Sequence, residues 1–81
     1  MLPKAERKLT RLQHDAVYPR LVAAMLGLAD ETRPQGVERL TGRPGWRIRV
    51  GTYRIIYEID DVIRIVSVEE LGHRRDVYAT R

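Results

Sequence analysis

The sequence contains no cysteine, which excludes disulfide bonds and thiolate metal sites. Histidine is scarce as well, because only His14 and His73 are present and they lie far apart in the chain, so we do not expect a zinc site. No apolar run approaches the roughly 20 residues of a membrane-spanning helix. The N-terminal stretch MLPKAERK also lacks the apolar segment of a secretory signal. We therefore expect a cytoplasmic protein with no membrane segment, metal ion or cofactor.

The length of the chain limits it to one domain. Its 81 residues have a mass of 9.4 kDa, and 43% of them are hydrophobic while 32% are charged. This balance is typical of a small globule with a thin core and not of a disordered chain. We expect a single domain over residues 1–81.

Positive charge exceeds negative charge, and arginine supplies most of it. Fifteen lysines and arginines face eleven acids, which gives a net charge of +4 and a pI near 10.0. All of these cations except Lys4 and Lys8 are arginine, the better side chain for planar, bidentate phosphate recognition. The charge indicates a nucleic acid or an acidic protein as partner.

The pattern of apolar residues predicts two helices in the first half of the chain and strands in the second half, which together form an α+β domain. Pro3 opens a helix whose apolar residues follow at helical spacing, and Asp15 is a plausible N-cap of a second helix that ends near Asp30. After Gly45, apolar and polar residues alternate, which is the spacing of a strand with one buried face. The expected strands cover residues 46–50, 53–59 and 62–68, the last of them buried on both faces or central in the sheet, and residues 75–79 could form one helical turn.

The strand pattern brings three arginines to one face of a hairpin. If Gly51-Thr52 is a two-residue turn, Arg49 lies opposite Arg54, and Arg47 shares their face. Like charges opposite one another destabilise a sheet, so three unpaired arginines favour a bound anion. The alternative is a solvated face that nearby glutamates neutralise, and a three-residue turn with a bulge would remove the argument. The apolar residues alternate with these arginines and should face the core.

Two residues after the strands carry candidate chemistry. Tyr78 lies among three arginines, where it could stack on a base or accept a proton, or else pin the C-terminal turn to the core. His73 is the side chain of this region that ordinarily titrates near neutrality, although an exposed loop histidine is the alternative.

Two segments make the sequence recognisable: GRPGWRIRVGTYRIIYEIDD at 42–61 and GHRRDVY at 72–78. With the run LADETRP in the helical half, they resemble the RelE/ParE superfamily of toxin–antitoxin toxins, and the RelE branch most closely. The resemblance covers essentially the whole chain. It implies two N-terminal helices, an αα-hairpin, packed on a small antiparallel sheet.

The resemblance also implies an activity, which is cleavage of mRNA in the ribosomal A site without a metal. The 2′-hydroxyl of the substrate attacks the adjacent phosphate, and the 5′-oxygen leaves. By motif position, Arg54 stabilises the charge on the phosphate, Arg74 lies on the leaving-group side, and Tyr78 orients or deprotonates the substrate. The implied catalytic residues are Arg47, Arg49, Arg54, His73, Arg74 and Tyr78, and the implied RNA-binding residues are Arg43, Arg47, Arg49, Arg75 and Arg81.

The sequence departs from the family pattern in two respects. Arginine replaces lysine at positions 47 and 49, and because arginine is a poor proton-transfer group, acid–base work falls to His73 or Tyr78. The strand that usually precedes the first helix is missing from this sequence, which could leave an open sheet edge that invites a partner.

We therefore expect the toxin of a type II toxin–antitoxin pair that acts as a ribosome-dependent mRNA endonuclease and inhibits translation. A ParE-type inhibitor of DNA gyrase without nuclease chemistry, or a non-catalytic remnant that binds only an antitoxin, are the alternatives. The expected partners are the ribosome, mRNA and an acidic antitoxin, partly disordered when free, in a toxin–antitoxin hetero-oligomer without membrane contact.

Overall fold

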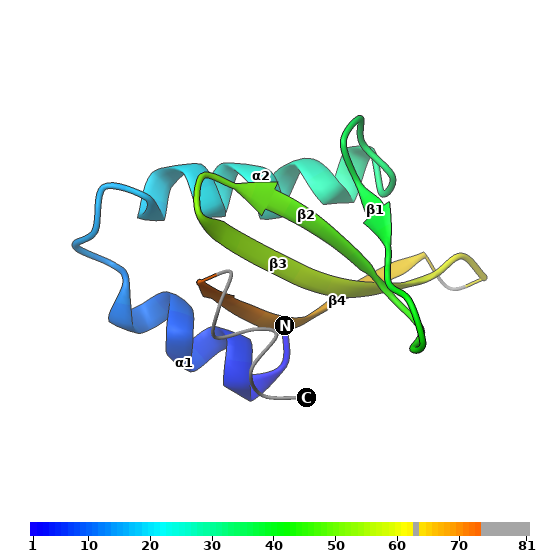
Figure 1. Cartoon of the computed structure of the whole chain (residues 1–81), viewed down its shortest axis with the longest axis horizontal. Coiled ribbons are helices and arrows are strands. Elements are labelled where there is room, and N and C mark those ends of the chain that lie inside the picture. Colours follow the sequence, from blue (N-terminus) through cyan, green and yellow to red (C-terminus); the bar gives the residue numbers. More distant parts are fainter. Residues whose placement is uncertain (63, 74–81) are drawn as a thin grey trace.

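Two helices pack on one face of a four-stranded antiparallel sheet, which confirms the predicted α+β fold (Figure 1). The structure, a computed structural model, describes residues 1–62 and 64–73. The elements are α1 (Pro3–Arg11), α2 (Tyr18–Asp30), β1 (Glu38–Arg39), β2 (Trp46–Val50), β3 (Tyr53–Asp60) and β4 (Ile65–His73). The spatial order of the strands equals their order in the sequence, so every connection joins neighbours.

The helices begin and end close to where the sequence predicts. Pro3 lies in the first turn of α1, where its missing N–H costs nothing, and Ala5 buries the inner face of that helix. The prediction that Asp15 is the N-cap of α2 is wrong, because α2 begins at Tyr18 and its N-cap is Val17. Asp15 still accepts a 2.9 Å hydrogen bond from the Val17 N–H and so shapes the turn before the helix.

The hairpin of β2 and β3 has the predicted register. Val50 lies opposite Tyr53, Arg49 opposite Arg54, and Trp46 opposite Tyr57. Gly51 has a φ of 62°, a left-handed conformation that glycine adopts at no steric cost. The two-residue turn therefore sets which side chains share a face.

The third predicted strand is wrong in its bounds and in its position. β4 runs from Ile65 to His73 instead of over residues 62–68, and it lies at the sheet edge, so it is not central. The buried strand is β3, in which four consecutive residues are buried. The register between β3 and β4 shifts between Ile56 and Tyr57, a bulge that leaves Glu69 as the extra residue of β4. The two-residue strand β1 was not predicted, because two residues carry no period.

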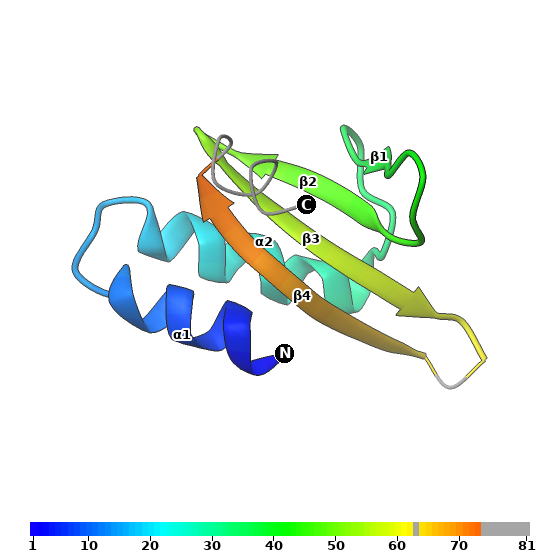
Figure 2. The same ribbon diagram turned by 60° about the horizontal axis from the view of Figure 1, so that its bottom comes forward.

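The core lies between the helices and the face of the sheet that does not carry Arg47, Arg49 and Arg54. Leu21 and Leu28 of α2 pack there with Ile55, Tyr57 and other buried residues, namely Ala5, Leu12, Val50, Val68 and Leu71. Figure 2 shows that α1 follows only one end of β4, while α2 crosses the sheet. The other end of β4 is therefore less covered than the rest of the sheet.

Candidate functional site

Three arginines lie on the sheet face opposite the helices, as the hairpin predicts, and we call Arg47, Arg49 and Arg54 the basic face. Arg49 and Arg54 are cross-strand partners, and Arg47 lies two residues before Arg49 on β2. Directly opposed residues in an antiparallel pair point to the same side. The register of β2 and β3 thus brings three guanidinium groups to one face of the sheet.

The basic face carries an acid that the sequence did not suggest. Glu38 of β1 lies opposite Arg47, and its Oε1 accepts a 3.2 Å hydrogen bond from Arg47 Nε and lies 3.1 Å from Arg47 Nη2. The same oxygen lies 4.0 Å from Arg49 Nη2. The expectation of an unpaired cluster is therefore wrong, because the short strand β1 places a carboxylate beside it.

The three arginines also differ in their exposure. Arg49 has 64% of its side chain exposed, whereas Arg54 is buried, with 5% of the residue exposed. The neighbouring Ile56 is buried on the same face. The solvated outer face that was the alternative does not describe Arg54. A substitution at Arg54 is consequently expected to alter folding as well as charge.

Arg43, a predicted RNA contact, reaches across to β4. Its Nη1 lies 3.1 Å from Glu70 Oε2, and its Nη2 lies 3.4 Å from Glu69 Oε1. Lys4 of α1 lies 3.9 Å from the other oxygen of Glu70. Because of the bulge, two successive glutamates of β4 meet one guanidinium, which neither local propensity nor motif spacing could reveal.

A second carboxyl group faces this ion-pair cluster. Glu58 of β3 shares a hydrogen bond with Glu69, and burial together with this contact raises the pKa of Glu69 to about 7. Arg43 acts in the opposite direction but does not outweigh burial. We call Glu58, Glu69, Glu70 and Arg43 the carboxylate cluster.

His73 ends β4 and is not the exposed loop histidine that was its alternative. Its ring lies edge-on to Tyr53 with centroids 5.8 Å apart, and the residue is half-buried. The other predicted site residues of the C-terminal segment, namely Arg74, Arg75, Tyr78 and Arg81, lie outside the described residues.

Trp46 is covered by two guanidinium groups. Arg33 lies 5.0 Å and Arg39 5.4 Å from the ring centroid, the geometry of cation–π contacts. Arg33 also donates two hydrogen bonds to Asp61, of 3.3 and 3.0 Å, which lower the pKa of that carboxyl. These contacts join the segment after α2 to the β3–β4 turn, which supports packing as the role of Trp46.

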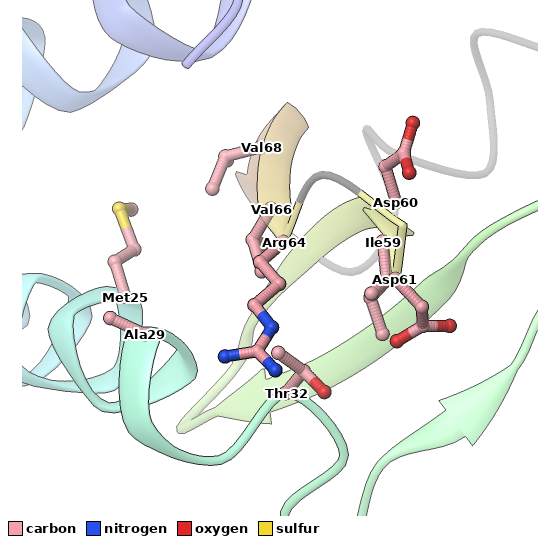
Figure 3. Close-up of a pocket in the computed structure, with 9 residues that line it drawn as sticks. All are labelled: Met25, Ala29, Thr32, Ile59, Asp60, Asp61, Arg64, Val66 and Val68. Carbon is pink, nitrogen blue, oxygen red and sulfur yellow. The ribbon is translucent and has the colours of Figure 1, made fainter.

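A groove of about 280 Å³ opens where α1 leaves the sheet uncovered (Figure 3). Its walls are largely apolar and come from α2, β3 and β4. The residues that line it are Met25, Ala29, Thr32, Ile59, Asp60, Asp61, Arg64, Val66 and Val68.

One cation lies at the mouth of this groove. Figure 3 shows Arg64 extending from the start of β4 toward Thr32 and Ala29. Among residues 1–62 and 64–73, no carboxylate forms an ion pair with Arg64. Leu26, on the same helix as Ala29, is 69% exposed. The groove therefore combines apolar surface with a guanidinium that has no acidic partner in the described part of the chain.

The described residues contain neither a membrane-spanning helix nor a cluster of metal ligands. Neither of the two helices is long and apolar enough to cross a membrane. Within the same residues, no three histidine, cysteine, aspartate or glutamate side chains gather in a way that could hold a metal ion.

Comparison with known proteins places the chain in a family. The model of the family described as the ParE toxin of the type II toxin–antitoxin system, parDE, matches residues 1–78. No curated protein matches the sequence. The family match covers nearly the whole chain, including both helices, all four strands and the basic face.

Proposed function

The chain belongs to the ParE toxin family of type II toxin–antitoxin systems, and we propose that its toxic activity is ribosome-dependent, metal-independent cleavage of mRNA. The observation that carries this proposal is the pairing of Arg49 with Arg54 across the hairpin, with Arg47 on the same face. Two like charges in direct opposition are unfavourable by themselves in a sheet, and together they concentrate positive charge that attracts an anion. A phosphodiester is an anion of this kind.

The proposed chemistry needs cations more than it needs a nucleophile from the protein. The 2′-oxygen of the substrate forms a bond to the adjacent phosphorus while the bond from phosphorus to the 5′-oxygen breaks. Negative charge grows on the phosphate oxygens and on the leaving oxygen during this step. Preorganised guanidinium groups stabilise that charge, and removing one donor of this type typically costs about 10²–10³ in rate. Arg49 and Arg54 are the proposed contacts to the phosphate, and Arg74 is the proposed contact on the leaving-group side.

Proton transfer is assigned to residues other than the arginines. Arginine keeps its proton in water, so it is a poor general base. We assign the removal of the 2′-hydroxyl proton to the phenolate of Tyr78, with the neutral imidazole of His73 as the second choice, and the departing 5′-oxygen takes a proton from water. We expect Tyr78→Phe to reduce cleavage more than His73→Gln. If His73→Gln is more damaging and flattens the pH–rate profile near neutrality, the two roles are exchanged.

The test of the nuclease is cleavage of mRNA on translating ribosomes, read as the chemistry of the product ends. We expect a cyclic phosphate at the new 3′ end and a free 5′-hydroxyl. Arg49→Gln should reduce the rate about 10²-fold without unfolding the protein, because this side chain is largely exposed. Arg7→Gln on the exposed side of α1 removes the same charge and should leave the rate unchanged. Intact mRNA with folded wild-type protein would disprove the proposal.

Inhibition of DNA gyrase without nuclease chemistry is the second candidate. Two observations favour it: Glu38 pairs with Arg47, and Glu69 and Glu70 pair with Arg43, so acids neutralise part of the predicted RNA surface. A supercoiling assay with purified gyrase distinguishes the candidates. Loss of supercoiling together with intact mRNA would select the gyrase inhibitor.

The family implies a cognate antitoxin, and we propose that the groove beside α2 receives an amphipathic helix from it. Met25, Val66 and Val68 supply the apolar surface that a helix needs, and Arg64 supplies the charge that an acidic segment would meet. The net charge of +4 on the chain and an acidic antitoxin predict an association rate that falls as salt rises.

A further inference from the structure

The carboxylate cluster and the basic face occupy the same side of the sheet. Glu38, Arg47, Ile56 and Glu70 form one row across β1, β2, β3 and β4, since each is the cross-strand partner of the next. Neighbouring strands lie about 4.8 Å apart, so the backbones of Arg47 and Glu70 are roughly 10 Å apart. This separation is close to the Debye length of about 8 Å at physiological salt, so charge on the cluster acts, partly screened, on an anion that approaches the basic face.

The Arg43 side chain is anchored at both ends. It belongs to the β1–β2 loop, which lies tightly over β3: a Cβ at Gly45 would lie 3.1 Å from the Tyr57 carbonyl oxygen. The Leu40 N–H donates a 3.0 Å hydrogen bond to the Gly45 carbonyl and closes this loop. The loop thus fixes the base of the Arg43 side chain, while Glu69 and Glu70 hold its tip.

The charge of the cluster depends on one proton. With all groups ionised, three glutamates face Arg43 and Lys4, which gives a formal charge of −1. Protonation of one carboxyl brings these five groups together to zero. Glu69 is the carboxyl of the cluster that shares a hydrogen bond with a second carboxyl, Glu58, and only 18% of its side chain is exposed. Its surroundings among the described residues are Glu58 of β3, Glu70 of β4, Arg43 of the loop and, through Glu70, Lys4 of α1.

We propose that Glu69 is a proton-controlled gate on the anion-binding face. When Glu69 is ionised, Arg43 is held between two carboxylates, and the cluster repels phosphate. When Glu69 takes up a proton, Arg43 keeps its contact with Glu70 and one guanidinium nitrogen becomes free to bind a phosphate of the RNA. This proposal depends on the proposed function in one respect, which is that the basic face binds an anion such as an RNA phosphate.

The shifted pKa of about 7 places this transition in the physiological range. Between pH 6 and pH 8 the protonated fraction of such a group falls from about nine-tenths to about one-tenth. One charge-assisted hydrogen bond changes affinity by roughly tenfold, and screening at a partly exposed site reduces this, so we expect a change of about 3- to 10-fold.

The experiment measures binding of a labelled single-stranded 12-mer of uridylate by fluorescence anisotropy at pH 6 and pH 8. We expect the wild type to bind about 3- to 10-fold more tightly at pH 6. Glu69→Gln should bind equally at both pH values, with the affinity of the wild type at pH 6, because glutamine is neutral throughout. Arg43→Gln should bind weakly at both. Glu6→Gln, an exposed glutamate on α1, is the matched control and should behave as wild type.

Three results would overturn the gate. If Glu69→Gln retains the pH dependence of the wild type, Glu69 does not control binding. If His73→Gln alone abolishes the pH dependence, the histidine is the titrating group. If RNA binding requires Arg49 but is equally strong in wild type and Glu69→Gln at pH 8, the basic face stands and the gate is wrong. Absence of RNA binding in every variant would instead remove the basic face as an anion site, and the gate with it.

Discussion

Replacing Glu69 by glutamine should make the folded protein more stable at pH 8 and leave its stability nearly unchanged at pH 5. In the fold this carboxyl is partly buried and hydrogen-bonded to Glu58, and both effects raise its pKa from 4.5 to about 7. Glutamine preserves the shape and can donate the hydrogen bond to Glu58 without carrying a charge. It loses the ion pair with Arg43, but Glu70 still holds that guanidinium at 3.1 Å.

The sign and size of the effect follow from proton linkage. Between pH 4.5 and pH 7 the folded protein binds the Glu69 proton more tightly than the unfolded chain does, so the free energy of unfolding falls as pH rises. The stabilisation is fully present below about pH 4.5 and is lost as the pH passes about 7. The full shift corresponds to about 3 kcal/mol, and screening by solvent at the rim of the cluster lowers the expected gain at pH 8 to about 1–2 kcal/mol.

Urea unfolding at several pH values between 5 and 8, followed by circular dichroism, measures this effect. The quantity to compare is the difference in the free energy of unfolding between Glu69→Gln and wild type, because titrating groups away from the carboxylate cluster contribute equally to both. Glu6→Gln provides the control and should show no pH-dependent difference. A difference between Glu69→Gln and wild type that is the same at pH 5 and pH 8 would refute the linkage argument.

Three further predictions test other parts of the molecule. Gly51→Ala should lower the free energy of unfolding by roughly 1 kcal/mol, because its φ of 62° is strained for alanine, and an unchanged urea midpoint would contradict this. Ala29→Glu should weaken antitoxin binding at least tenfold in calorimetry by placing a charge in the groove, whereas Ala23→Glu on another face of α2 should not, and equal affinities would exclude the groove as the docking site. Asp61→Asn should lower the thermal unfolding midpoint above pH 4 and have progressively less effect as pH falls, because Arg33 lowers the pKa of Asp61 in the fold and the stabilisation is lost as that carboxyl is protonated. A difference that persists at pH 2 would show that the ion pair is not its cause.

The hairpin and its two faces follow from the amino-acid pattern alone. A glycine at the first position of a two-residue turn, with apolar residues alternating on either side, leaves one register in which the apolar set faces the helices. Arg47, Arg49 and Arg54 then fall together on the other face without further information. The two helices follow in the same way from Pro3, the apolar spacing and the break near Asp15, because these signals act over a few residues.

Which carboxylates pair with these arginines, and which arginines are buried, depends on the folded arrangement of the chain. Glu38 reaches Arg47 through a two-residue strand, too short to leave a period in the sequence. The bulge in β4 moves Glu69 and Glu70 to one guanidinium, and its position follows from how two strands align and not from either strand alone. Burial and the contact with Glu58 of the neighbouring strand raise the pKa of Glu69. Arg54 is buried and Arg49 is exposed although both alternate identically with apolar neighbours. Local pattern fixes the direction in which a side chain points, while charge pairing, burial and proton affinity depend on residues that are distant in sequence and meet only when the sheet is assembled.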